Sequence, residues 1–317
     1  MLKGLALTPP VLGRISIGRV VEKAGKRLPE KDDEFTITSQ VQTRGNWVNH
    51  PVDAELRKAA ASMGPDQAST KLRSIPVRLL FDDPDLNLRT NYSLFDRKTG
   101  RPLCIGNGET CRRSTSAGVQ TLECATPEGC QLGLDQGCKP YGRLNVRIDV
   151  EADDQPDELG SFVFRTTGFN SIRTLAARLQ YFQAITGGKL SALPLELRLR
   201  GKSTTQSHRS AIFYVDLTVR GGMTLLEAIQ QSKVTWAERE AAGFDQAALD
   251  AAARAGFALG AFEDSAEDGV AVVEEFYPVT AGETTSSTEA DQPETQTTQP
   301  RPTLSKKLEA KAAMLKH

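Results

Sequence analysis

The chain has 317 residues, of which 39% are hydrophobic and 25% charged, and its formal net charge at pH 7 is −1. This composition is typical of a soluble globular protein, and the absence of any run of about 18 apolar residues excludes a transmembrane helix. Two prolines interrupt the brief apolar run of the first residues, MLKGLALTPPVLGRIS, so no signal peptide is expected. The sequence therefore predicts a cytoplasmic protein that does not bind a membrane.

The charges are distributed unevenly along the chain. Residues 263–300 contain ten acidic residues and no Lys or Arg, whereas residues 301–317 contain five basic residues and one acidic residue. Of the totals of 39 and 40, this leaves 34 basic and 29 acidic residues before residue 263. A mildly basic body of this kind is compatible with nucleic acid as a partner but is weak support for it.

Residues 1–102 are predicted to form a β-rich N-terminal part of the core. Apolar and polar residues alternate with a period of two in GRISIG and FTITSQ, as in half-buried strands. The expected elements, in chain order, are a strand at 13–18, a loop at 23–33, a strand at 35–40, a helix at 52–62, a strand at 75–81, a polar loop at 82–87 and two strands within 91–103 around the turn 97–100.

Residues 103–142 contain all five cysteines, with the spacing C-x6-C-x12-C-x5-C-x7-C and many glycines between them. Clustered thiols in a reducing compartment bind metal more often than they form disulfides. Structural zinc takes four ligands, although the usual short spacing between paired cysteines is absent here. Hydrolytic zinc usually needs histidine or carboxylate ligands, and the chain has only three histidines. Residues 103–142 are therefore predicted to be a cysteine-rich insertion that binds a structural zinc ion, and five ordinary buried cysteines or a redox pair remain the alternative.

Residues 143–262 are predicted to form the α+β part of the core. The expected elements are strands at 142–150 and 161–167, a helix at 171–186, strands at 193–201 and 211–221, two short helices that begin with the capping boxes Thr224–Glu227 and Thr235–Glu238, and a helix at 245–257. In the first helix, spacings of three and four place Ile172, Leu175, Leu179, Phe182 and Ile185 on one stripe, with Asn170 or Ser171 as the cap and Gly187-Gly188 as the end.

This order of elements predicts an α+β fold with helices packed on a mostly antiparallel sheet. Beyond it, residues 263–303 have too few large apolar side chains to offset the entropy of ordering and are predicted to be an acidic disordered linker. Residues 304–317 are predicted to form a short basic helix.

Basic residues recur on the predicted strands. Alternation places Arg198, Arg200 and Lys202 on one strand face, and Arg143 and Arg147 lie on an earlier strand. Such rows can follow the phosphates of a nucleic acid, whereas a solvated sheet face is the simpler interpretation. No Walker A, GxSxG, HExxH or dinucleotide-binding motif is present, so the sequence offers no catalytic constellation.

Several motifs taken in order carry a resemblance to a known family. They are GRISIG, FTITSQ, LCIGNGETCRR, GCKPYGRLNVRI and FRTTGFNSIRTL. Together they resemble the recombination directionality factor-like family of phages and integrative elements over roughly residues 13–219. Bacterial members of this family are often labelled hydrolases or metal-binding proteins.

The resemblance implies a non-enzymatic zinc-binding accessory protein of DNA recombination, whose best-known relatives bind a serine integrase and switch it from integration to excision. It further implies that the zinc ligands are Cys104, Cys124, Cys130 and Cys138, with Cys111 as an additional thiol. The expected partners are a site-specific recombinase or another recombination protein, and DNA. The alternatives are a single-stranded nucleic-acid binding or annealing protein and, less favoured, a metal-dependent hydrolase.

Overall fold

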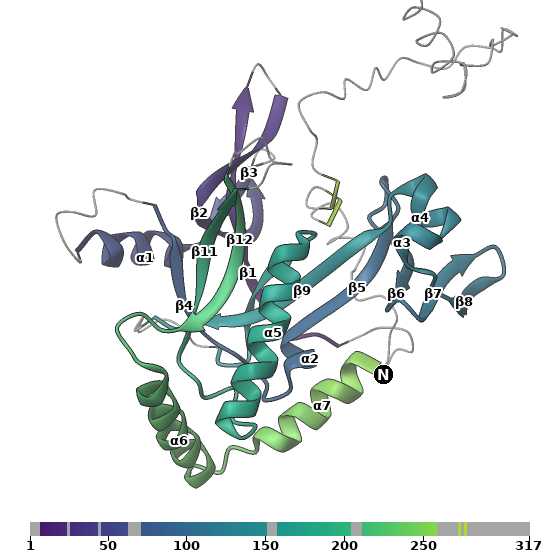
Figure 1. Cartoon of the computed structure of the whole chain (residues 1–317). Coiled ribbons are helices and arrows are strands. Elements are labelled where there is room, and N and C mark those ends of the chain that lie inside the picture. Colours follow the sequence, from purple (N-terminus) through teal and green to yellow (C-terminus); the bar gives the residue numbers. More distant parts are fainter. Residues whose placement is uncertain are drawn as a thin grey trace, which may run out of the picture. The chain divides into compact units, whose positions relative to one another are not determined.

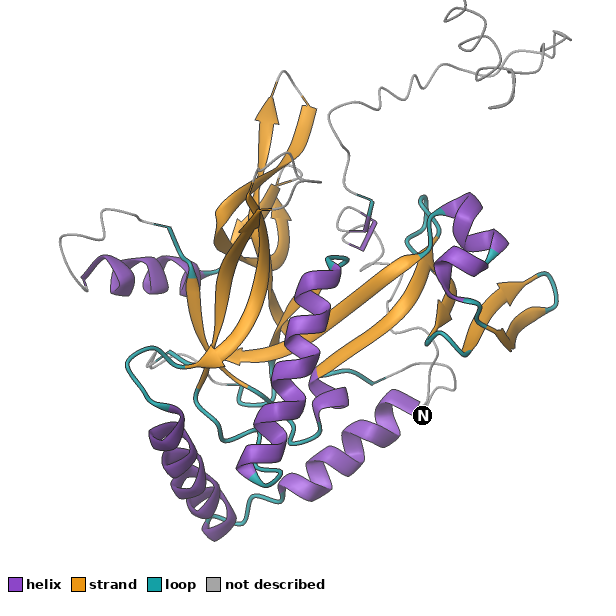
Figure 2. Ribbon diagram, in the orientation of Figure 1, coloured by secondary structure: helices purple, strands orange, loops and turns teal. Residues whose placement is uncertain are grey.

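The computed structural model of the chain describes residues 7–23, 26–43, 46–62, 71–150, 157–203, 211–258, 272–273 and 276–277 (Figure 1). Within these residues the fold is α+β, with a mostly antiparallel twelve-stranded sheet (Figure 2), and this confirms the predicted class. No helix within these ranges is long and apolar enough to cross a membrane. The predicted basic helix 304–317 lies outside the described residues, as does most of the predicted linker 263–303.

The main run of the sheet has the order β3-β2-β1-β10-β9-β5-β6-β7-β8, while β4, β11 and β12 branch from β9. The strands of the main run are β1 (Val11–Lys23), β2 (Lys26–Thr43), β3 (Asn46–Asn49), β5 (Leu88–Phe95), β6 (Pro102–Gly106), β7 (Thr110–Thr115), β8 (Gly118–Glu123), β9 (Lys139–Ile148) and β10 (Ser161–Thr166). The branch strands are β4 (Ser74–Arg78), β11 (Leu195–Ser203) and β12 (Ala211–Val219).

Strand β9 joins the two parts of the sheet. Its first half pairs with β5, in the register Ser93 to Lys139, and its last two residues pair with β4, in the register Val77 to Ile148. The pairing of β1 with β10 is parallel, and all the other strand pairs are antiparallel. The cysteine-rich residues therefore lie at the end of β5 and β9 that is remote from β4 (Figure 1).

The helices are α1 (Pro51–Ser62), α2 (Pro84–Asn87), α3 (Thr126–Gly129), α4 (Gln131–Gln136), α5 (Phe169–Thr186), α6 (Leu225–Ala241) and α7 (Gln246–Ala258). The predicted stripe on α5 is largely correct, because Ile172, Leu175, Leu179 and Phe182 are buried. Ile185 was wrongly included, since it is 44% exposed. The α5 cap is Gly168, with no side-chain hydrogen bond, and not Asn170 or Ser171.

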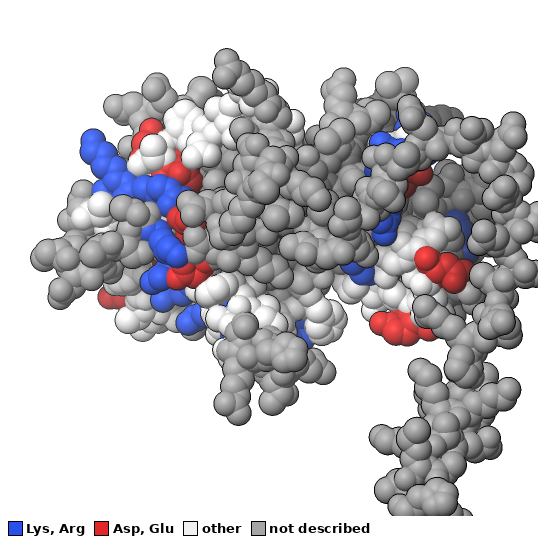
Figure 3. Space-filling view, turned by 90° about the horizontal axis from the view of Figure 1, so that it is seen from above, with Lys and Arg blue, Asp and Glu red and all other residues white. Residues whose placement is uncertain are grey.

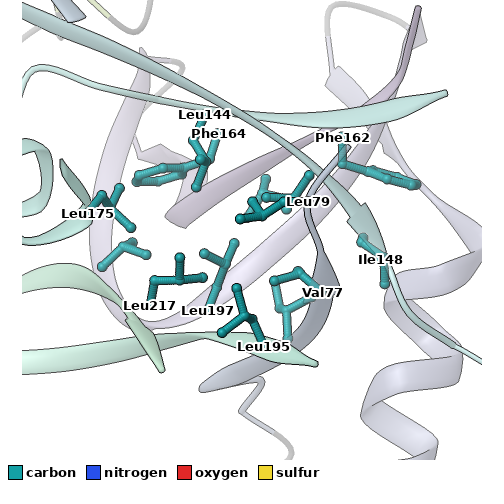
Figure 4. Close-up of a cluster of buried hydrophobic side chains, with 14 of the residues drawn as sticks. Val77, Leu79, Leu144, Ile148, Phe162, Phe164, Leu175, Leu195, Leu197 and Leu217 are labelled. Carbon is teal, nitrogen blue, oxygen red and sulfur yellow. The ribbon is translucent and has the colours of Figure 1, made fainter. Parts of the chain in front are cut away.

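The main core lies between α5 and the branched sheet. Leu144 and Phe164 extend from β9 and β10 toward Leu175 of α5 and toward Leu197 and Leu217 of β11 and β12 (Figure 4). The alternating strands supply this core because every second side chain points to the same side of the sheet. All five side chains are at most 2% exposed. Strand β9 contributes to this buried layer, which therefore fixes the position of β9, and the cysteine-rich residues directly precede this strand in the sequence.

Three further local predictions were wrong. Residues 23–33 do not form a loop, because β1 and β2 stay paired through most of this range, with Arg19 opposite Glu30 and Lys23 opposite Lys26. The polar loop 82–87 contains the one-turn helix α2, which Asp83 caps by accepting a hydrogen bond from the Asp85 amide at 2.9 Å. The two short helices are one helix, α6, because the second Thr-x-x-Glu motif lies inside it.

A fourth finding concerns the predicted linker. Val272 and Phe276, inside the range 263–303, are fully buried, and Phe276 packs edge-on against Phe95 and Tyr141. The Tyr277 hydroxyl donates a hydrogen bond to the Phe95 carbonyl at 2.9 Å. At least this part of the segment therefore packs on the core, beside the start of β9.

The two Thr-x-x-Glu motifs provide a matched test of capping. The Thr224 hydroxyl accepts from the Glu227 amide at 3.2 Å, and the Glu227 carboxylate accepts from the Thr224 amide at 2.7 Å. We expect Thr224→Ala to lower the free energy of unfolding by about 1 kcal/mol, because it leaves helix N–H groups without this acceptor. Thr235→Ala should change it by less than about 0.5 kcal/mol, because Thr235 lies within the helix, where alanine is favourable. Urea unfolding measures both free energies. An equal loss of unfolding free energy in the two variants would contradict the assignment of Thr224 as the cap.

Candidate metal centre

The five cysteines come from five different places along the chain. Cys104 lies on β6, Cys111 on β7, Cys124 just after β8, Cys130 between α3 and α4, and Cys138 just before β9. All five are free thiols. Cys104 and Cys111 are buried together with Leu94, and Cys124 and Cys138 pack against them. The fold thus gathers into one cluster residues that are up to 34 positions apart in the sequence.

Tight turns bring the later cysteines back to the strands. The Cys124 amide donates to the Glu109 carbonyl at 2.9 Å, which fixes the end of the β7–β8 hairpin beside β6. After α4, Gly137 adopts a left-handed conformation with φ of 80°, which glycine accommodates without strain. The Cys138 amide then donates to the Gly133 carbonyl at 3.2 Å. This glycine-dependent turn sets Cys138 at the start of β9.

Four of the cysteines line one small cavity of about 10 Å³. They are Cys104, Cys124, Cys130 and Cys138. Cys111 is not among the lining residues, and its thiol donates to the Glu123 carbonyl at 3.6 Å. The four residues that the family resemblance implied as ligands are therefore the four that share this cavity.

The chemistry of these side chains fits a thiophilic metal such as zinc, since four thiolates are a common structural zinc ligand set. Space around the sulfurs is limited, because a Cβ added at Gly106 would lie 2.7 Å from the Cys124 Sγ. In the described part of the chain, however, no three His, Cys, Asp or Glu side chains are arranged as a group that could hold a metal ion. The thiols border the cavity, and metal binding would require them to converge.

The thiols influence one another electrostatically. Burial, together with the negative charges of Cys104, Cys124 and Cys130, raises the pKa of Cys138 to about 12. Burial and a hydrogen bond with Cys104 raise the pKa of Cys111 to about 11. Crowding of like charges in a partly buried site favours neutral thiols, so a bound cation would have to displace protons to form thiolates.

Cys130 differs from its neighbours. A hydrogen bond from the Gly133 amide, assisted by the side chain of Arg113, lowers the pKa of Cys130 below its usual value. The Arg113 Nη2 lies 3.4 Å from the Cys130 Sγ. Arg113 also lines the cavity. The sequence interpretation did not include this arginine, although alternation along β7 from the buried Cys111 places it on the inner face.

The predicted nucleic-acid residues lie on two strands, β9 and β11, and have different surroundings. On β11, the Arg198 Nε donates to Glu196 at 2.8 Å and the Arg200 Nε to Asp216 at 3.3 Å, while Lys202 is exposed. Where charged side chains are described on the face in Figure 3, basic and acidic ones lie beside each other. The two β11 arginines are thus already paired with carboxylates.

Arg143 and Arg147 lie on β9. Arg143 is 9% exposed and stands in register between Arg89 of β5 and Arg165 of β10, whereas Arg147 is opposite Arg78 of β4. A row of three arginines across neighbouring strands was not apparent from the sequence, because it depends on the register of the pairing.

Comparison with known proteins identifies the family. The family model described as Gp3-like, recombination directionality factor-like, matches residues 12–220. This range includes β1 to β12 apart from the first residue of β1, and therefore contains all five cysteines. No curated protein and no solved structure matches the chain. Because the match covers about two thirds of the sequence, the chain belongs to the recombination directionality factor-like family.

Proposed function

We propose that the chain is a non-enzymatic accessory protein that acts with a site-specific recombinase of a phage or integrative element, and that a structural zinc ion stabilises it. Membership of the recombination directionality factor-like family supports a role in recombination. The observation that most supports the metal is the single cavity that Cys104, Cys124, Cys130 and Cys138 share, from which Cys111 is absent.

In this proposal Cys104, Cys124, Cys130 and Cys138 hold the zinc ion. Zinc would supply a cross-link between the β6–β8 strands, the turn at α3–α4 and the start of β9. Two other interactions hold the cysteines in place besides the metal. They are the hydrogen bond from the Cys124 amide to the Glu109 carbonyl and the packing of Leu94 and Leu132 against the cysteines. A cavity of about 10 Å³, the space of about one water molecule, leaves little room for a substrate, which favours a structural ion over a hydrolytic one.

An assay of recombination direction tests this function. Purified serine integrase of the same element is incubated with DNA that carries the two hybrid attachment sites, with and without the chain. We expect excision products only when the chain is present, and we expect the chain to inhibit the integration reaction. Unchanged direction and rate of recombination in both reactions would refute the proposed role.

A second candidate is binding of single-stranded nucleic acid, for which the exposed Lys202 and the half-buried Arg89 and Arg165 supply basic side chains. Fluorescence polarisation with a labelled oligonucleotide separates the two functions. Binding without integrase that weakens steeply between about 50 and 200 mM salt would favour the second candidate. A DNA complex that forms only with integrase would favour the first.

A further inference from the structure

Arg113 is the basic side chain within the cysteine cluster. Strand β7 places it opposite Cys104 of β6, and it lines the cavity together with the four cysteines. Its Nη2 lies 3.4 Å from the Cys130 Sγ, and its positive charge interacts with the thiol of Cys104, which lies opposite it on β6. Its Nε is buried and has no hydrogen-bond partner among the described residues. The guanidinium therefore lies close to two cysteines of different elements, Cys104 on β6 and Cys130 between α3 and α4, and retains an unused donor.

A zinc site made of four thiolates is negatively charged and is stabilised by a positively charged hydrogen-bond donor nearby. Four thiolates around one zinc ion carry a net charge of about −2, which is costly in a partly buried location. Donors that lie just outside the ligands orient them and reduce this cost. An arginine suits this role because it stays protonated and offers several N–H groups in a fixed geometry.

We propose that Arg113 balances the charge of the four-cysteine site and thereby sets its affinity for zinc. The proposal rests on the proposed metal site and extends it to a residue that is not a ligand. Arg113 is a positioning residue, since it acts through the sulfurs of Cys104 and Cys130. The adjacent Arg112 is a natural control, because it is exposed, lies on the opposite face of β7 and is paired in register with Ile105 and Thr121.

The test compares the full-length chain with the variants Arg113→Gln, Arg113→Lys and Arg112→Gln. Zinc affinity is measured by competition with a chromophoric chelator. We expect Arg113→Gln to weaken zinc binding by about 10- to 100-fold, the usual effect of removing a partner of metal ligands. Arg113→Lys should recover part of this loss because it restores the charge, and Arg112→Gln should bind zinc as tightly as the unmodified chain.

Two further measurements distinguish charge balance from a general effect on folding. In the cobalt-substituted protein, the sulfur-to-metal charge-transfer band should shift in Arg113→Gln and not in Arg112→Gln. The metal-free forms of the Gln variants should show the same circular dichroism.

The proposal is overturned if Arg113→Gln binds zinc with unchanged affinity while the unmodified chain binds one zinc ion, and in that case the metal site stands. If the unmodified chain binds no zinc, both the metal site and the role of Arg113 are refuted. A metal-free Arg113→Gln chain that has lost its fold would also refute charge balance, since the side chain would then be needed for folding itself.

Discussion

Replacement of Cys138 by serine is expected to abolish zinc binding, whereas replacement of Cys111 by serine should leave it intact. Cys138 lines the cavity together with Cys104, Cys124 and Cys130, and it lies at the start of β9. Loss of one of four ligands opens the site, and the binding free energy of a structural zinc ion contributes directly to folding. We therefore expect zinc content to fall from about one ion per chain to near zero.

Cys111→Ser is the matched control, because it removes a thiol from the same cluster but not from the cavity lining. Its zinc content, measured by elemental analysis of purified protein, should equal that of the unmodified chain. Zinc retained by Cys138→Ser, or lost from Cys111→Ser, would show that the ligand set is incorrect. Because Cys111 is only 2% exposed, its substitution is expected to cost some stability, so metal content is the decisive measurement.

The second large effect is expected in the main core. Phe164 is 2% exposed and packs within the cluster that contains Leu144 and Leu175. Phe164→Ala should lower the free energy of unfolding by about 3–5 kcal/mol, because it removes buried surface and leaves a cavity. Denaturant unfolding monitored by fluorescence measures this loss.

Phe169→Ala is the control for this substitution. Phe169 is the first residue of α5 and is 60% exposed, so its removal should change the free energy of unfolding by less than about 0.5 kcal/mol. Similar losses in both variants would contradict the placement of Phe164 in the core and of Phe169 at the surface.

Much of the fold could be predicted from hydrophobic periodicity. Strands such as β9 and β10 alternate clearly, and α5 has a regular apolar stripe, so their type and approximate bounds were correct. One error arose because the same local sequence pattern is compatible with two different structures. A Thr-x-x-Glu motif caps α6 at Thr224 but lies within the same helix at Thr235, and the sequence alone does not distinguish these environments.

The candidate site was only partly accessible from the sequence. Composition indicated the cysteine cluster, and the family resemblance separated Cys111 from the other four residues. Alternation along β7 places Arg113 on the same face as Cys111, but the meeting of this face with the later cysteines depends on contacts between distant segments. The packing of Phe276 beside β9 depends on such contacts as well. Strand register and long-range packing are not properties of a local pattern.

The parallel pairing of β1 with β10 has a consequence for synthesis of the chain. Ile15 lies opposite Phe164, so one edge of β1 lacks its partner until about 149 further residues have been made. At about 5–20 residues per second, this interval lasts roughly 7 to 30 s on the ribosome. During that time β1 and β2 can pair as a hairpin, while the other edge of β1 stays without β10, its partner strand. The nascent chain is therefore most exposed to aggregation before residue 166 emerges.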